Sequence, residues 1–330
     1  MKNLSSNTVV YLTGPTASGK TDIGLALAKV MGDVEIINAD SRQVYKYFSI
    51  VTAKPDGEWV KCKEYPEKQF VSGGVVHHLM DFLAPDKFYS AGQFYEDACG
   101  IIAELHKKNV VPVIVGGTGL YIRSLIAGLA EIPKVDTAVR ARLYERLEHE
   151  GLDKLVEELS GIDPGVVLNS RVEIRNPRRV IRALEVYHGT GLTLTAWHKR
   201  TVAPKFNNIV FGIEWPREEL YKRINTRVKR MWDNGALEEV KGVIKLGYDT
   251  KTPGFEGLGV NHIVQYLRNC IREDQVVSLW KRDTRRYAKR QLTWFKREPN
   301  IRWIKMSEQK SGVMVAVEEI INLIRGTEKV

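Results

Sequence analysis

The apolar positions in the first third of the chain follow two periods. Short apolar runs occupy 9–12, 34–37 and 110–115, interrupted only by Glu35, and such runs are typical of strands buried in a parallel sheet. Between the runs, apolar residues recur at helical spacing, at Ile23, Leu27, Val30 and Met31 and again along 93–107. Strands that alternate with helices predict an α/β fold, with a parallel sheet flanked by helices. Residues 51–75 follow neither period, so we expect a loop there.

The strand pattern stops near residue 123 and resumes near residue 205. Helical stretches occupy 138–149 and 152–159. A further helix is expected to open at Asn176-Pro177, because asparagine caps helices well and proline suits the first helical position. We therefore predict an all-helical insert domain over 123–204, within an α/β core formed by 1–122 and 205–330.

The C-terminal part of the core returns to mixed patterns. Residues 209–215 have strand character, 216–228 and 237–246 have helical character, and a loop is expected over 252–259. The last predicted helix, 275–296, is strongly basic and carries interleaved aromatic residues at Tyr287, Trp294 and Phe295. Basic residues mixed with aromatic ones suit an RNA backbone and its bases. A helix with buried aromatic side chains and solvated charges would produce the same pattern. We expect both interpretations, RNA contact and a buried aromatic face, to apply in part.

The first apolar run leads into Gly14, Pro15, Thr16, Ala17, Ser18, Gly19, Lys20 and Thr21. This segment fits G-x-x-x-x-G-K-[ST], the phosphate-binding P-loop, and it stands between a predicted strand and a predicted helix as that loop does. Its backbone N–H groups and the helix N-terminus would face phosphate oxygens. Lys20 would neutralise a phosphate, and the Thr21 hydroxyl would hold Mg²⁺. The expected fold is therefore P-loop NTPase-like, with either a nucleotide or another diphosphate as the ligand.

Polar residues follow the second and third predicted strands. Asp40 comes shortly after the second strand, and Gly116-Gly117-Thr118-Gly119 follows the third. Because the C-terminal ends of parallel strands converge on the ligand crevice, we expect Asp40 near the P-loop. A nucleotide-hydrolysing P-loop protein usually has an acid after the third of these strands, and here glycines take its place. A small P-loop kinase with Asp40 as the base remains open.

Composition and charge narrow the class of protein. The 330 residues suffice for one large domain with an insert, and 50 Lys+Arg against 40 Asp+Glu give a net charge of +10, which favours a polyanionic partner. The cysteines, Cys62, Cys99 and Cys270, lack zinc spacing, as expected for reduced thiols. The N-terminal residues lack the apolar stretch of a signal peptide, and no apolar run has membrane-spanning length. We expect a cytoplasmic protein that does not bind membranes.

Two further clusters invite a functional reading. His77, His78 and Asp81 suggest a metal site, but adjacent side chains on a strand point apart, so we do not expect one. Arginines are dense between 171 and 182, where Glu173 is the only acid. Charged helix faces are usually just solvated. Guanidinium groups bind phosphate through paired hydrogen bonds, however, so we favour contact with phosphate or RNA.

Seven segments together carry a resemblance to one family. They are GPTASGKT (14–21), DSRQVY (40–45), TAKP (52–55), HHL (77–79), GGTGLY (116–121), RVIRALEV (179–186) and TRRYAKRQLTWF (284–295). In this ordered set, the chain resembles the tRNA dimethylallyltransferases, also called tRNA isopentenyltransferases, over residues 9–304. The segment Gly259-Val260-Asn261-His262 departs from the family, which usually has Gly-Tyr there. The C-terminal part shows no zinc finger of the kind found in eukaryotic relatives, which favours the bacterial type.

The resemblance implies a reaction. The P-loop would bind the pyrophosphate of dimethylallyl diphosphate with Mg²⁺, and the dimethylallyl group would pass to N6 of the adenosine 3′-adjacent to the anticodon of tRNA. In the family, the residue that matches Asp40 is the general base. The residue that matches Thr118 contacts the target adenosine, and the one that matches Arg140 approaches the reaction centre. The insert would grip the anticodon stem-loop. We expect a monomer.

The resemblance also implies a set of tRNA contacts, which comprises Asp40, Ser41, Arg42, Gln43, Arg178, Arg179, Val180, Ile181 and Arg182. Three alternatives stay open. An adenylate isopentenyltransferase performs the same chemistry on free AMP, ADP or ATP, a P-loop kinase or ATPase turns over ATP, and a non-catalytic RNA-binding protein would not need Asp40. The arginines of the insert and the basic C-terminal helix favour tRNA over a free nucleotide.

Overall fold

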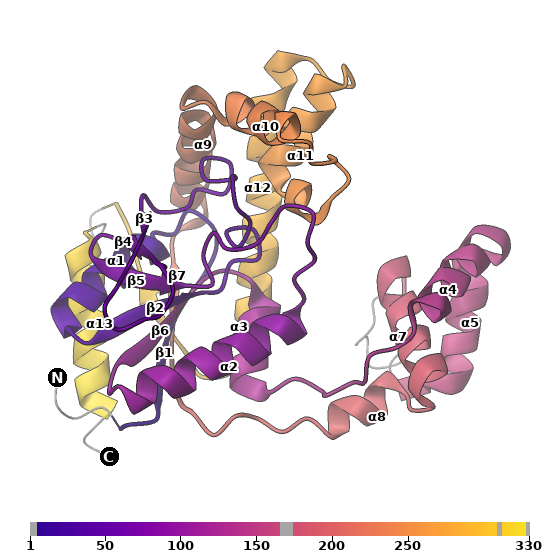
Figure 1. Cartoon of the computed structure of the whole chain (residues 1–330), viewed down its shortest axis with the longest axis horizontal. Coiled ribbons are helices and arrows are strands. Elements are labelled where there is room, and N and C mark those ends of the chain that lie inside the picture. Colours follow the sequence, from indigo (N-terminus) through magenta and orange to yellow (C-terminus); the bar gives the residue numbers. More distant parts are fainter. Residues whose placement is uncertain (1–4, 166–173, 309–311, 328–330) are drawn as a thin grey trace. The chain divides into compact units, whose positions relative to one another are not determined.

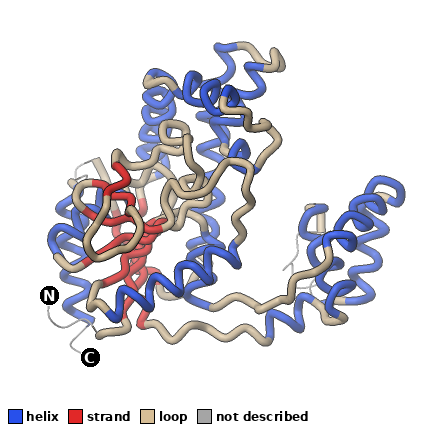
Figure 2. The backbone as a smooth tube through the Cα atoms, in the orientation of Figure 1, coloured by secondary structure: helices blue, strands red, loops and turns tan. Residues whose placement is uncertain are grey.

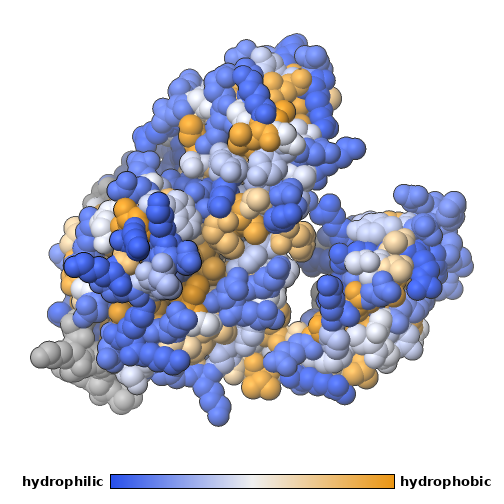
Figure 3. All heavy atoms as spheres, in the orientation of Figure 1, coloured by the Kyte–Doolittle hydropathy of each residue, from blue (hydrophilic) through white to orange (hydrophobic). Residues whose placement is uncertain are grey.

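The computed structural model describes residues 5–165, 174–308 and 312–327. Its contacts divide the chain into two compact units, one formed by Met1–Ile126 with Lys205–Val330 and the other by Ala127–Pro204 (Figure 1). Among the described helices, none combines the length and the apolar composition that crossing a membrane requires. Hydrophilic residues predominate on the face of both units shown in Figure 3.

The larger unit is built on one eight-stranded sheet, whose strands are red in Figure 2. The order of the strands is β3-β4-β5-β2-β6-β1-β7-β8. The strands are β1 (Thr8–Thr13), β2 (Val34–Asn38), β3 (Glu58–Val60), β4 (Gln69–Ser72), β5 (Val75–His78), β6 (Val111–Val115), β7 (Asn207–Glu214) and β8 (Ile301–Lys305). The six strands from β5 to β8 in this order run parallel, and β3 and β4 pair antiparallel at one edge. The predicted α/β fold with a parallel sheet is confirmed.

The expectation of a loop over 51–75 is wrong, because β3 and β4 lie within it. Edge strands bury little apolar surface, and in β4 only Phe70 and Ser72 are buried, so no continuous apolar run marks these strands. The predicted loop over 252–259 is also too long, since the 3₁₀ turn Pro253–Glu256 is followed by a helix that begins at Leu258.

The helices of the larger unit are α1 (Lys20–Met31), α2 (Ala91–Lys107), α3 (Gly119–Ala127), α9 (Arg217–Asp233), α10 (Ala236–Lys245), α11 (Leu258–Leu267), α12 (Glu273–Phe295) and α13 (Val313–Thr327). They either cover the faces of the sheet or, as α10 and α11 do, pack on other helices away from it (Figure 1). Side chains alternate between the faces of a strand. Val10 and Leu12 of β1 therefore join the core on the side of α1 and α13, whereas Val9 and Tyr11 join the core on the side of α2 and α3 (Figure 1).

In the described part of the smaller unit, the regular secondary structure is helical: α4 (Thr137–Glu150), α5 (Leu152–Ile162), α7 (Pro177–Thr190) and α8 (Leu194–Lys199). Helix α7 begins as predicted, because Asn176 Oδ1 accepts the N–H of Arg178 at 3.1 Å and Pro177 takes the first helical position. Helices α4, α5 and α7 pack around a core of leucines together with Val180 and Ile181. Arg171 and Glu173 of the predicted arginine cluster lie outside the described residues.

Candidate active site

Three neighbouring parallel strands, β2, β6 and β1, end at one edge of the sheet. The P-loop (residues 14–21) follows β1, the Asp40 loop (residues 39–43) follows β2, and the glycine loop (residues 116–119) follows β6. Side chains and backbone from all three loops line one pocket, whose walls are Thr16, Lys20, Thr21, Ile36, Asn38, Asp40, Gln43, His77, Met80, Val115, Gly116, Gly117, Arg227 and Gln291. The prediction that Asp40 lies near the P-loop is confirmed.

The backbone of the P-loop requires its first glycine. Gly14 has φ +137°, and a Cβ there would lie 2.6 Å from the carbonyl oxygen of Ile213. The loop is held from outside by Arg223, whose Nε donates to the Ala17 carbonyl at 2.9 Å. No side chain caps α1, so the first backbone N–H groups of this helix point out of its N-terminus without a cap. The end of the P-loop therefore presents N–H donors and the positive pole of a helix, as an anion site does.

Lys20 lies half-buried beside a second cation. Its Nζ donates to the Pro15 carbonyl at 2.7 Å. Burial and the nearby charge of Arg227 lower the pKa of Lys20 to about 7, while Asp40 acts in the opposite direction. Burial likewise lowers the pKa of Arg227. Two cations that share one pocket favour an anionic ligand, because such a ligand would offset both charges.

Arg227 is a pocket residue that the sequence motifs do not mark. It projects from α9, a helix that begins at Arg217, far beyond the P-loop in sequence. The available signal was the spacing of Arg223 and Arg227, which are four residues apart and therefore lie on one helix face. That pattern is common on solvated helices and did not indicate a ligand.

The Asp40 carboxylate is oriented by its own loop. Asp40 Oδ1 accepts the N–H of Arg42 at 2.9 Å, and the Asp40 N–H donates to Asn38 Oδ1 at 3.2 Å. Thr118 Oγ1 accepts the N–H of Ser41 at 3.0 Å, which joins the glycine loop to the Asp40 loop. These bonds place the Asp40 side chain in the pocket wall next to the glycine loop.

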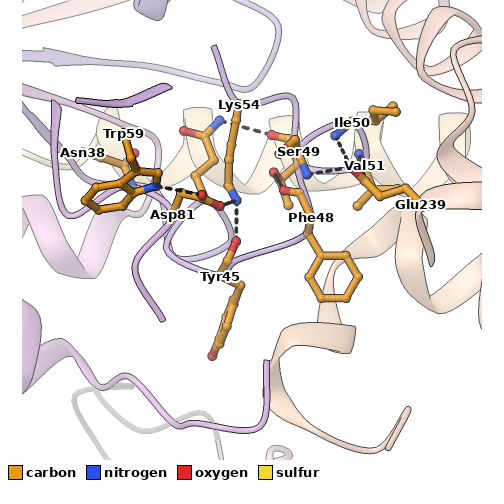
Figure 4. A network of polar contacts seen from close by, with 12 residues as sticks. Asn38, Tyr45, Phe48, Ser49, Ile50, Val51, Lys54, Trp59, Asp81 and Glu239 are labelled. Atoms are coloured by element: carbon orange, nitrogen blue, oxygen red, sulfur yellow. Dashed lines mark hydrogen bonds and ion pairs between the residues drawn. The ribbon is translucent and has the colours of Figure 1, made fainter. Parts of the chain in front are cut away.

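A second network supports the chain that follows the Asp40 loop (Figure 4). The buried Lys54 ammonium bonds to the Asp81 carboxylate and to the Tyr45 carbonyl. Burial lowers the pKa of Lys54, and Asp81 opposes that change. The ion pair therefore fixes residues 45–54 against the segment that follows β5.

The Glu239 carboxylate holds the same segment from α10. It accepts the backbone N–H groups of Ser49 and Ile50 at 2.7 Å each and that of Val51 at 2.9 Å (Figure 4). A carboxylate that accepts several N–H groups acts as a strong anchor for a loop. The predicted tRNA contact Gln43 belongs to this support, because it is buried and its Nε2 donates to the carbonyls of Thr52 and Ala53 at 3.1 Å.

The two adjacent histidines separate as expected. His78 Nε2 lies 2.6 Å from Glu35 Oε2, whereas His77 faces the pocket. His77 is 3% exposed, and neither of its ring nitrogens has a hydrogen-bond partner among the described residues. Burial lowers the pKa of His77 to about 4, so the ring is neutral at physiological pH. Across 5–165, 174–308 and 312–327, no three His, Cys, Asp or Glu residues are grouped as metal ligands.

The predicted tRNA contacts of the smaller unit fall into two groups. Arg178 and Arg179 are exposed, and Arg182 and Arg140 each lie 3.1 Å from the carboxylate of the buried Glu185. Val180 and Ile181 are 0% and 1% exposed. The side chains of these two residues therefore do not present a surface to RNA. Their prediction as contacts needs correction, because they form the core that supports the arginine-bearing face of α7.

The basic helix α12 also divides into two faces. Arg286, Lys289 and Arg290 are exposed. Phe295 is fully buried, and the Trp294 ring packs so closely that a Cβ on Gly119 would lie 2.4 Å from it. These two aromatic residues thus belong to the core, as the alternative interpretation of this helix expected. Burial and the nearby Asp40 raise the pKa of Tyr287, which is half-buried.

The chain is similar to known proteins over nearly its whole length. A family model described as IPP transferase matches residues 43–298. A curated tRNA dimethylallyltransferase from Acetivibrio thermocellus is 41% identical over 91% of this chain and 92% of its own length. Another from Natranaerobius thermophilus is 37% identical over 97% and 92%.

Solved structures agree with these sequence relatives. A tRNA isopentenylpyrophosphate transferase from Bacillus halodurans is 32% identical, with a TM-score of 0.69 over 98% of this chain and 97% of that one. A tRNA isopentenylpyrophosphate transferase from Staphylococcus epidermidis is also 32% identical, with a TM-score of 0.66 over 97% of this chain and 99% of that one. A eukaryotic dimethylallyltransferase acting on tRNA is 24% identical and shares the fold, with a TM-score of 0.75.

Proposed function

Since the chain belongs to the IPP transferase family, we propose that it transfers the dimethylallyl group of dimethylallyl diphosphate to N6 of the adenosine 3′-adjacent to the anticodon of tRNA. The products are N6-isopentenyladenosine and pyrophosphate. The observation that carries this proposal is the single pocket in which the cations Lys20 and Arg227 face the carboxylate of Asp40. An anionic leaving group and a proton acceptor are the two elements that such a transfer needs.

The diphosphate binds at the P-loop. Its oxygens accept hydrogen bonds from the N–H groups at the start of α1 and lie near Lys20 and Arg227. As the bond between C1 of the prenyl group and oxygen breaks, negative charge grows on the leaving pyrophosphate. Fixed donors and cations stabilise that charge in the transition state.

Mg²⁺ fits the same place. The Thr21 hydroxyl lines the pocket, and such an oxygen ligand suits an ion that keeps several waters and binds through substrate phosphates. When bound, Mg²⁺ neutralises charge on the leaving pyrophosphate. Thr21 and the P-loop would hold it on the diphosphate side of the pocket.

Asp40 acts on the adenosine. An adenine amino group is a poor nucleophile, so it needs a base while its nitrogen bonds to C1 of the prenyl group. Asp40 takes the N6 proton at that point, and Thr118, hydrogen-bonded to the N–H next to Asp40, contacts the adenosine. The target base leaves the anticodon-loop stack to reach this carboxylate, at a cost of roughly a few kcal/mol.

The tRNA contacts come from both units. The exposed Arg178 and Arg179 and the partly exposed Arg182 bind phosphates of the anticodon stem-loop, and Arg42 and Ser41 contact it near the pocket. Arg140 of α4, now paired with Glu185, approaches the reaction centre in the complex. The exposed arginine and lysine side chains of α12 add contacts to the phosphate backbone of the tRNA. We further propose a cytoplasmic monomer, which sedimentation and fractionation would check.

A transfer assay tests the proposal. The protein is incubated with dimethylallyl diphosphate, Mg²⁺ and either unmodified tRNA or AMP, and the nucleosides are analysed by mass spectrometry. We expect N6-isopentenyladenosine in tRNA alone. Product on AMP alone would make the protein an adenylate isopentenyltransferase, and ATP turnover without prenyl transfer would identify a P-loop kinase or ATPase.

A further inference from the structure

Gln291 is a buried amide on the basic helix α12. It is 7% exposed and lies between Arg290 and Leu292 on α12. Its Oε1 accepts the N–H of Thr16 in the P-loop at 2.8 Å, and its Nε2 donates to the carbonyl of Gly117 in the glycine loop at 2.8 Å. One side chain thus bonds to both loops.

The backbone hydrogen bonds that pair β1 with β6 end where the two loops begin, and beyond that point Gln291 connects the loops. Strands β1 and β6 pair up to Leu12 and Val115, and the Gly116 N–H donates to the Leu12 carbonyl at 3.2 Å. Beyond that point, within the described residues, no backbone hydrogen bond joins the P-loop to the glycine loop. The amide of Gln291 accepts on one side and donates on the other, as a peptide group of an inserted strand would.

Gln291 and Gly117 approach each other closely, and each position favours the residue type that occupies it. A Cβ at Gly117 would lie 2.3 Å from Gln291 Nε2, so a larger residue would displace the amide. Among side chains of this length, glutamine alone both accepts and donates, since glutamate only accepts and methionine does neither. Satisfying both loops therefore requires glutamine at position 291 and glycine at position 117.

The connection continues to the carboxylate. The Thr118 N–H donates to the Ala39 carbonyl at 3.1 Å, and Thr118 Oγ1 accepts the N–H of Ser41. The polar path therefore runs from the P-loop through Gln291 and the glycine loop to the residues that flank Asp40. The distance between the P-loop and Asp40 therefore depends on Gln291 and the glycine loop, which lie between them on this path.

We propose that Gln291 is a positioning residue, which holds the P-loop and the glycine loop at the separation that lets Lys20 and Asp40 serve one pocket. This inference rests on the proposed function for its catalytic consequence. Its structural consequence, the shape of the pyrophosphate site, does not require transfer. Small displacements of reacting groups lower rates strongly, so the effect reaches kcat as well as binding.

Two single variants test the inference. Gln291→Met removes both hydrogen bonds at similar volume, and Gly117→Ala leaves the glutamine in place but displaces its amide. Both are measured at low temperature, well below their own unfolding transitions, for the binding of inorganic pyrophosphate with Mg²⁺ by calorimetry, for kcat and KM, and for tRNA affinity. Thr293→Ala, on an exposed position of the same helix, is the matched control.

We expect each variant to bind pyrophosphate about tenfold more weakly and to lose about 10- to 100-fold in kcat, with tRNA affinity within about twofold of wild type. The double variant should be little worse than either single variant, because both break the same bridge. The Thr293→Ala protein should match wild type.

Three results would overturn the inference. One is unchanged pyrophosphate affinity and kcat in a folded variant that merely melts at a lower temperature, which would make Gln291 a stabilising residue only. Another is full additivity in the double variant. The third is a wild-type protein that binds no pyrophosphate. If Gln291→Met does not fold, Gly117→Ala alone decides between these outcomes. The wild-type protein could also fail to transfer the prenyl group while its pyrophosphate binding still depends on Gln291. That result would count against the proposed function and not against the role of Gln291.

Discussion

The hydroxyl of Thr118 and the backbone N–H of Ser41 are joined by a hydrogen bond of 3.0 Å. Thr118 belongs to the loop after β6, and Ser41 follows Asp40 in the loop after β2. The bond therefore sets the position of the proposed base against the residue proposed to contact its substrate. Loss of the carboxylate, however, leaves this bond intact, since the bond uses the backbone of Ser41.

Asp40→Asn should abolish transfer while leaving tRNA affinity nearly unchanged. Asparagine keeps an oxygen that can accept the N–H of Arg42, but it cannot take the N6 proton, so we expect a loss of at least about 100-fold in single-turnover rate. Asp40→Ala should behave likewise. The control is Asp33→Asn, in the exposed turn before β2. Activity equal to wild type in either Asp40 variant would exclude Asp40 as the base.

Arg178→Ala and Arg182→Ala should weaken tRNA binding in a salt-dependent way. Each arginine that neutralises a phosphate contributes to the slope of log K against log salt, so each variant should reduce that slope by about one. Arg182 also pairs with Glu185, and its variant is therefore checked for folding by circular dichroism. Binding that is unchanged at every salt concentration would mean that α7 does not contact the tRNA.

The affinity for pyrophosphate should fall as pH rises above 7. Lys20 has a pKa lowered to about 7 in the ligand-free protein, and a bound anion raises it. Below pH 7, Lys20 is protonated in both the free and the pyrophosphate-bound protein. Above pH 7, the protein must take up a proton when pyrophosphate binds. Calorimetry at pH 8 in buffers of different ionisation enthalpy measures this uptake. Lys20→Met should bind with less proton uptake, and equal uptake in both proteins would contradict the assignment.

His77 should make the protein sensitive to acid. Its folded pKa of about 4 lies below the unfolded value of 6.5, so the unfolded chain binds more protons and stability is lost as pH falls from 6.5 towards 4. The full difference corresponds to about 3 kcal/mol. His77→Leu should reduce this loss in urea unfolding followed from pH 7.5 to 4.5, whereas the exposed His149→Asn should not. Parallel pH profiles for all three proteins would refute the expectation.

Glu239→Gln should destabilise the larger unit by about 1–3 kcal/mol, because an amide replaces a carboxylate that accepts three backbone N–H groups. Urea unfolding measures the change. Within the part of the chain that the structure describes, the neighbouring Glu238 pairs only with Lys241 on the surface, so Glu238→Gln should change stability by less than about 0.5 kcal/mol. Equal effects from the two variants would show that the loop does not depend on Glu239.

Four of the six parallel strands (β1, β2, β6 and β7), the P-loop and the start of α7 could be predicted from sequence, because each depends on residues close together in the chain. Short apolar runs marked β1, β2 and β6, and their shared parallel direction implied that Asp40 and the P-loop would meet at one edge. The ordered motifs also identified the family, and with it the reaction class.

Other features depended on the tertiary structure. Lys20 acquires its neighbour Arg227 from α9, and the P-loop acquires Gln291 from α12, two helices that pack against the site from the C-terminal half of the chain. Val180 belongs to a segment that resembles the tRNA-contacting one, yet packing buries it. Local spacing carries no information about such pairings, because which distant side chains come into contact is decided when the helices bury their apolar faces together.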